Sequence, residues 1–169
     1  MEREGIITMK GNPLTLVGPE LRPGDRAPDF SVLDQSLQPV SLANFSGKIK
    51  VISTTPSLDT PVCDLQAHRF NEEAASLGEH VVILNISMDL PFAIARFCIA
   101  GDIKAISVLS DHREASFGTK WGMLIKELRL LARGAFIVDQ GNIIRYAEIV
   151  SEQTDQPDYD KILSALRKL

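Results

Sequence analysis

Residues 54–66, TTPSLDTPVCDLQ, separate an apolar run from a helical pattern. The apolar run, 49–52, is typical of a buried strand, and the helical pattern begins at about Val62. The prolines and polar residues between them end the strand before the helix starts. Cys63, one of two cysteines in the chain, is therefore predicted in the first turn of a helix. Free N–H groups and the helix dipole favour an anion there, such as a thiolate.

Length and charge limit the classes of function. The chain has 169 residues, which suits one domain spanning 1–169, and its net charge is −4 with Lys and Arg dispersed. A nucleic-acid or anionic-membrane partner is not expected, because such surfaces cluster basic residues. No run approaches the ~20 apolar residues of a membrane span. The N-terminus lacks the apolar core of a signal peptide, so we expect a cytoplasmic protein.

Cysteine usage points to redox chemistry rather than to a metal or another cofactor. Neither Cys63 nor Cys98 has the spacing of a zinc site, and the three histidines are scattered. In the cytoplasm both cysteines are reduced by default, so a disulfide between them would be transient rather than structural.

Hydrophobic patterning predicts an α/β fold with a mixed central sheet flanked by helices, preceded by an N-terminal β-hairpin. Asp89 is expected to cap one helix, with Pro91 in its first turn and Gly101 after its end. That helix is apolar nearly all round, which suits core packing, a dimer face or a docking surface equally well. The expected strands are 6–9, 14–17, 29–33, 40–42, 48–53, 81–87, 106–109, 134–138 and 143–149, and the expected helices are 62–77, 91–100, 116–121 and 159–169.

The spacing Pro-x-x-x-Thr-x-x-Cys, formed by Pro56, Thr60 and Cys63, resembles that of peroxiredoxins. The longer run 59–63 is similar to the thiol peroxidase branch of that family. Further similar runs are 89–93, 96–98, 108–111, 131–133 and 157–159. The resemblance covers nearly the whole chain in order. It implies a thioredoxin-like fold and an antioxidant enzyme that reduces hydrogen peroxide or alkyl hydroperoxides through a cysteine pair.

The resemblance also implies roles for five residues. Cys63 would be the peroxidatic cysteine, which becomes a sulfenic acid, and Cys98 the resolving cysteine, which closes an intramolecular disulfide. Thr60 would hydrogen-bond the thiolate and the peroxide, Arg133 would donate to the same sulfur, and Pro56 would shield the pocket. The family is usually recycled by thioredoxin and usually forms homodimers.

The free energy needed to stabilise a thiolate at Cys63 is more than the start of a helix can supply. A free cysteine with a pKa of about 8.5 is almost entirely protonated at neutral pH. A helix N-terminus contributes about 0.3–1 kcal/mol, up to about 2, whereas a hydrogen bond to a charged group contributes roughly 1.5–3 kcal/mol. A cation and a hydroxyl donor are therefore required, which are the roles given to Arg133 and Thr60. Arg129 is a competing candidate for the cation.

Several alternatives stay open. Each cysteine could be a packing residue, and Arg133 could be a surface charge at a strand edge. The same cysteine pair would also serve a non-enzymatic redox sensor or relay. Thioredoxin-like disulfide exchange is disfavoured because it normally uses a CxxC pair. If both cysteines lie in helices, their Cα atoms must approach to about 4.4–6.8 Å, so we expect local unwinding before the disulfide forms.

Overall fold

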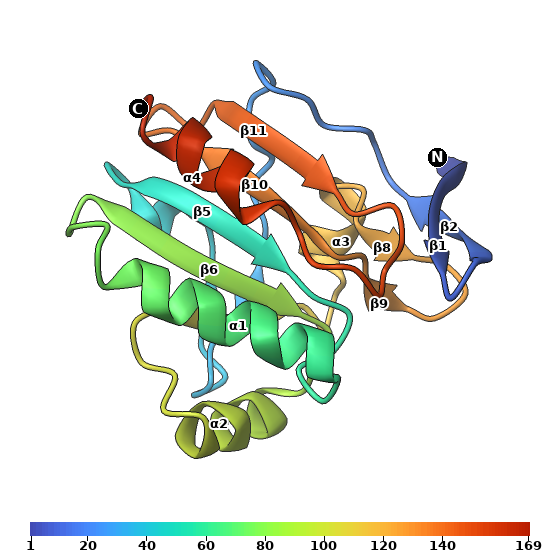
Figure 1. Ribbon diagram of the computed structural model, residues 1–169, viewed down its shortest axis with the longest axis horizontal. Helices are drawn as coiled ribbons and strands as arrows, with labels where there is room; N and C mark the ends of the chain where they lie inside the picture. The colour runs from blue at the N-terminus through green and yellow to red at the C-terminus, as the bar shows by residue number, and fades with distance from the viewer.

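A seven-stranded mixed sheet forms the centre of the computed structural model, which describes residues 1–169 (Figure 1). Its strands follow the order β11-β10-β5-β6-β7-β3-β4. Strands β5, β6 and β7 are mutually parallel, and β10 pairs antiparallel with both β5 and β11. The bounds are β3 Val32–Leu33, β4 Pro39–Val40, β5 Ile49–Thr54, β6 Val81–Ser87, β7 Ser107–Ser110, β10 Gly134–Val138 and β11 Ile144–Ile149.

Three helices cover one face of this sheet, as Figure 1 shows: α1 (Pro61–Ala74), α2 (Pro91–Ala100) and α4 (Tyr159–Leu166). They are there because apolar side chains of the helices and of alternate strand residues share one core. That core includes Val51, Ala67, Phe70, Ile83, Ile94, Ile137 and Ile162. Helices α1 and α2 are also the crossovers that parallel strands require. The prediction of a mixed α/β sheet flanked by helices is confirmed.

A second, four-stranded sheet of order β1-β2-β8-β9 lies beside the first. Its first two strands, β1 (Glu2–Met9) and β2 (Asn12–Val17), form the N-terminal hairpin that the sequence predicts. Strands β8 (Leu124–Ile125) and β9 (Leu130–Leu131) were not predicted, because two-residue strands carry no measurable alternation. Strand β8 pairs with β2, a contact between distant parts of the chain, and β9 pairs in turn with β8.

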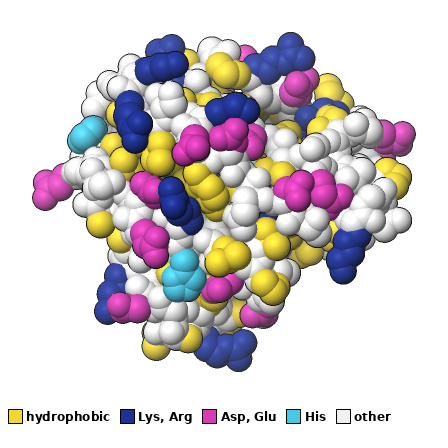
Figure 2. All heavy atoms as spheres, in the orientation of Figure 1, with side chains coloured by type: hydrophobic (Ala, Val, Ile, Leu, Met, Phe, Trp, Pro, Cys, Tyr) yellow, Lys and Arg dark blue, Asp and Glu magenta, His cyan; other side chains and the backbone are white.

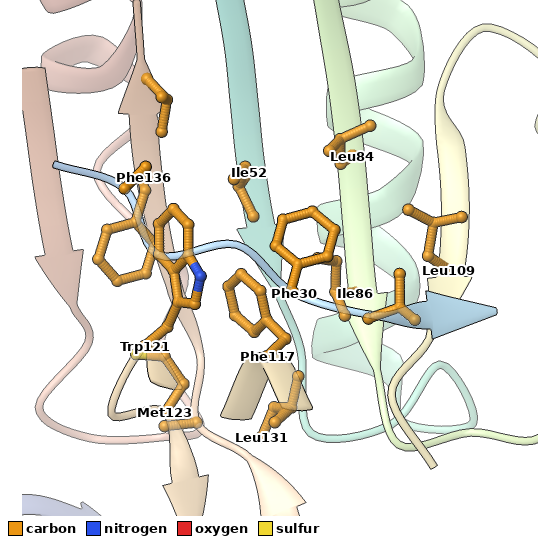
Figure 3. Close-up of a cluster of buried hydrophobic side chains, with 14 of the residues drawn as sticks. Phe30, Ile52, Leu84, Ile86, Leu109, Phe117, Trp121, Met123, Leu131 and Phe136 are labelled. Carbon is orange, nitrogen blue, oxygen red and sulfur yellow. The ribbon is translucent and has the colours of Figure 1, made fainter. Parts of the chain in front are cut away.

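The opposite face of the central sheet packs against an aromatic cluster (Figure 3). Trp121 stacks on Phe117 at a centroid distance of 4.8 Å and meets Phe136 edge-on at 5.1 Å. Its indole N–H donates to the carbonyl oxygen of Pro28 at 3.0 Å. Trp121 is 1% exposed, as expected for a packing residue. The short helices α3 (Ser116–Lys120) and η1 (Leu42–Phe45) complete the fold.

The start of α2 differs from the prediction. The capping residue is Leu90, which makes no side-chain capping bond, so the prediction that Asp89 caps this helix is wrong. The Asp89 carboxylate instead binds the loop that precedes α1. Helix α2 does end before Gly101, as predicted.

Acidic and basic side chains are intermixed over the face shown in Figure 2. No helix has both the length and the apolar character needed to cross a membrane.

Candidate active site

Strand pairing explains why Arg133 lies next to the helix that carries Cys63. Strand β5 ends at Thr54, and α1 begins at Pro61 after a loop of six residues. Strand β10 runs antiparallel to β5 and starts with Gly134 opposite Thr54. Arg133, immediately before β10, therefore lies at the edge of the sheet where α1 begins. A side chain at position 134 would collide with the Glu148 carbonyl oxygen, so the close packing after Arg133 requires glycine.

Cys63 is the third residue of α1 and has no exposed surface. Its backbone N–H donates to Oγ1 of Thr60, the capping residue of the helix, at 3.3 Å. The Thr60 hydroxyl itself donates to the carbonyl oxygen of Ser57 at 3.1 Å. In this arrangement Thr60 orders the turn that carries the sulfur. Pro56 is buried in the same loop.

The guanidinium of Arg133 contacts the Cys63 sulfur. Its Nη2 donates to Sγ at 3.2 Å, its Nη1 to Oε1 of Gln66 at 2.6 Å, and its Nε to the carbonyl oxygen of Gln153 at 3.1 Å. Arg133 is 2% exposed. Of the two arginines that the sequence left open, Arg129 is on the surface.

The charge balance around Arg133 is unusual. No carboxylate lies within 4.0 Å of its guanidinium, although the group is buried. A buried cation without a counter-ion is costly, because desolvation penalises the charge. A thiolate at Cys63 would supply the missing negative charge. The guanidinium is close enough, 3.2 Å, to donate to a negatively charged group at the position of Sγ.

Two glutamines hold the arginine in place. Gln66 donates through Nε2 to Ser53 Oγ at 2.6 Å and to the Thr54 carbonyl at 3.3 Å, which leaves its Oε1 aimed at Arg133. Gln153 accepts the Arg133 backbone N–H on Oε1 at 2.5 Å. Both glutamines are buried.

Sequence reasoning missed both glutamines. Gln66 could have been found, since residues three apart share a helix face and Gln66 follows Cys63 by three. Gln153 gave no signal, because it belongs to the irregular segment between β11 and α4.

A pocket of about 380 Å³ opens beside these groups. Its lining residues are Met9, Lys10, Pro56, Thr60, Pro61, Val62, Arg133, Gln153 and Thr154. The tip of the N-terminal hairpin thus forms one wall of the pocket. The carboxylate of Glu152 fixes this tip by accepting from Thr8 Oγ1 at 2.8 Å and from the backbone N–H groups of Lys10 and Gly11 at 2.9 and 3.1 Å. These hydrogen bonds lower the pKa of Glu152 to about 2.

Cys98 lies in a different environment, within α2. It is 6% exposed and packs in the apolar core beneath the helix layer. Burial raises the pKa of its thiol, and a hydrogen bond with Gln35 opposes this more weakly. Both cysteines are free thiols in this structure.

Comparison with known proteins identifies the family. Residues 22–163 match the family model described as Redoxin. The chain is 55% identical over 163 residues to a thiol peroxidase of Bacillus subtilis (strain 168), which covers 96% of this chain and 97% of that protein. This chain belongs to the thiol peroxidase branch of the peroxiredoxins. It is therefore a peroxiredoxin-type oxidoreductase.

Solved structures of peroxiredoxins agree with this family and its thioredoxin-like fold. A peroxiredoxin-like protein from Aquifex aeolicus superposes with a TM-score of 0.90 at 40% identity, covering 98% of both chains. A thiol peroxidase from Chromobacterium violaceum gives a TM-score of 0.86 at 25% identity, covering 96% of this chain and 95% of that one.

Proposed function

We propose that this peroxiredoxin reduces hydrogen peroxide and alkyl hydroperoxides through Cys63. The observation that supports this most directly is the buried Arg133 guanidinium, 3.2 Å from Cys63 Sγ and without a carboxylate partner. The same cation and the N–H groups at the start of α1 suit the negative charge that develops on the peroxide oxygens during the reaction. Thr60 and Pro56 line the pocket where the peroxide would bind.

The first step transfers one oxygen atom. The Cys63 thiolate attacks the nearer oxygen of the peroxide, the O–O bond breaks, and the leaving oxygen takes a proton to become water or an alcohol. The sulfur is oxidised by two electrons to a sulfenic acid, and the peroxide is reduced by two. Arg133 can hydrogen-bond both the sulfur and the leaving oxygen, because its guanidinium carries several donors in a rigid plane.

The second step in this proposal is attack by Cys98 on the sulfenic acid, which yields an intramolecular disulfide and water. A thioredoxin-type reductant would then return both cysteines to thiols by disulfide exchange. We place this cycle in the cytoplasm, where such reductants keep thiols reduced. We also propose that the chain forms one domain, 1–169, and a homodimer. The apolar residues Leu90, Phe92 and Ile99 are exposed on and beside α2. They are candidates for the dimer interface or for the surface that binds the reductant.

Peptide mapping after one equivalent of hydrogen peroxide tests the cysteine assignment. We expect a Cys63–Cys98 linkage within one chain. A linkage between chains, or sulfinic acid at Cys63 alone, would contradict it. Steady-state NADPH consumption with thioredoxin and its reductase tests turnover, with Cys63→Ser as the inactive control. Stoichiometric oxidation without turnover would favour a redox sensor or relay.

A further inference from the structure

The carboxylate of Asp89 connects the segments that lead into the two cysteine-bearing helices. Its Oδ1 accepts from Ser57 Oγ at 2.7 Å, and its Oδ2 accepts from the Leu58 backbone N–H at 2.8 Å. Both donors belong to the loop between β5 and α1, the helix that carries Cys63. Asp89 itself lies two residues before α2, the helix that carries Cys98.

The surrounding structure holds Asp89 in this position. Oδ2 also accepts from Ser87 Oγ at 2.8 Å, and the Asp89 carbonyl oxygen accepts from Ser110 Oγ at 2.5 Å. Ser87 and Ser110 end the adjacent parallel strands β6 and β7. His112 Nδ1 lies 2.9 Å from Ser110 Oγ and extends the network. The carboxylate is thus fixed to the rigid sheet while its remaining contacts reach the loop before α1.

The carboxylate does not cap its own helix, because the capping residue of α2 is Leu90, which makes no side-chain capping bond. Figure 1 shows that α1 and α2 start at the same end of the sheet, where β5 and β6 finish. A single side chain between these two starts can hold the loop before α1 next to the segment before α2.

We propose that Asp89 is a positioning residue that holds α1 and α2 in their reduced arrangement and thereby sets the rate of disulfide formation. This inference rests on the proposed function, in which Cys98 resolves the sulfenic acid of Cys63. In that step the Cys98 thiol loses its proton, its sulfur bonds to the Cys63 sulfur, and the sulfenic oxygen leaves as water. No external oxidant or reductant is needed, because the Cys63 sulfur is reduced as the Cys98 sulfur is oxidised.

The folded arrangement opposes this step. Cys98 is buried in an apolar core and Cys63 against Arg133, and a disulfide requires their Cα atoms to approach to about 4.4–6.8 Å. Opening of the loop before α1 breaks the bonds from Ser57 and Leu58 to Asp89. Until it opens, the sulfenic acid is exposed to a second peroxide, which oxidises it further to sulfinic acid. The Asp89 contacts therefore set the partition between disulfide and sulfinic acid.

The test measures this partition by rapid acid quench and mass spectrometry after mixing with hydrogen peroxide. The variants are Asp89→Ala, which removes all three side-chain bonds, and Ser57→Ala, which removes one and leaves Asp89 intact. Asp89→Asn is the conservative variant, because its side-chain amide can still hydrogen-bond both Ser57 and Ser87. The matched control is Asp59→Ala, since Asp59 is exposed in the same loop and its carboxylate makes no hydrogen bond.

For Asp89→Ala we expect disulfide formation to be about tenfold faster or more, the effect of losing one hydrogen bond to a charged group. The sulfinic acid formed at high peroxide falls in parallel. Ser57→Ala and Asp89→Asn give smaller changes of the same sign, and Asp59→Ala gives none. In Asp89→Ala we expect faster amide hydrogen exchange only in residues 57–66 and 89–98.

Unchanged or slower disulfide formation in both Asp89→Ala and Ser57→Ala, with normal sulfenic acid formation, would overturn the inference. Ser57→Ala decides the matter if Asp89→Ala does not fold. A parent protein that forms no sulfenic acid, or no Cys63–Cys98 disulfide, would instead refute the proposed function on which the inference rests.

Discussion

Replacing Arg133 by methionine removes the guanidinium from Cys63 and keeps an unbranched apolar side chain in place of the arginine stem. The lost contact, 3.2 Å from Nη2 to Sγ, is a hydrogen bond to a charged group, for which roughly 1.5–3 kcal/mol is typical. At about 1.36 kcal/mol per factor of ten, this loss predicts a rate constant for reaction with peroxide that is about 10- to 150-fold lower. The rate of reaction with peroxide falls further, because a donor to the leaving oxygen is also lost.

The assay uses a Cys98→Ser background so that one thiol is followed. Ultraviolet absorbance reports the thiolate, and quenched oxidation by hydrogen peroxide gives the second-order rate constant. Arg133→Lys tests geometry, since lysine keeps the charge but cannot donate to the sulfur, Gln66 and Gln153 as a planar fork. We expect it to lie between parent and Arg133→Met.

Arg129→Met is the matched control, because Arg129 is exposed and lies on the same segment. It should oxidise at the parent rate. An Arg133→Met protein that is folded and reacts within about threefold of the parent, well below the loss of one such hydrogen bond, would refute the role of this cation. Full activity of Arg133→Lys would show that charge alone suffices.

Three other perturbations have defined outcomes. Gln66→Leu should slow peroxide oxidation about tenfold, less than Arg133→Met, because Gln153 still holds the guanidinium. Asp111, a buried residue whose carboxylate accepts from the backbone N–H groups of Phe117 and Gly118 in α3, has a pKa raised to about 6 by desolvation. The fold therefore keeps a proton that the unfolded chain has lost, and the free energy of unfolding should decrease as pH rises from about 4 to 6, by up to about 3 kcal/mol. Urea titrations across this range should show a flatter dependence in Asp111→Asn, and an identical slope would contradict the assignment. Glu152→Gln should raise the KM for cumene hydroperoxide about threefold or more through a loosened hairpin wall, while hydrogen peroxide is unaffected; equal changes for both would argue against that wall.

Much of the fold could be predicted from local sequence patterns. The prolines and polar residues of 54–61 predict a strand ending and a helix starting around Cys63, and the structure has β5 ending at Thr54 and α1 beginning at Pro61. The hairpins at both ends of the chain and the central strands also follow from periodicity and turn chemistry. These features depend on residues close in sequence, so they can be read from it.

The sequence by itself determined that a cysteine begins a helix after a buried strand, and its resemblance to peroxiredoxins supplied an arginine to go with it. Tertiary structure alone decided that Arg133, seventy positions away, reaches Cys63, and that Gln66 and Gln153 hold it. It also directed Asp89 away from its own helix to the loop before α1. The physical reason is that pairing of β5 with β10 and alignment of β6 with β7 bring distant segments to one sheet edge, and no local pattern encodes that meeting.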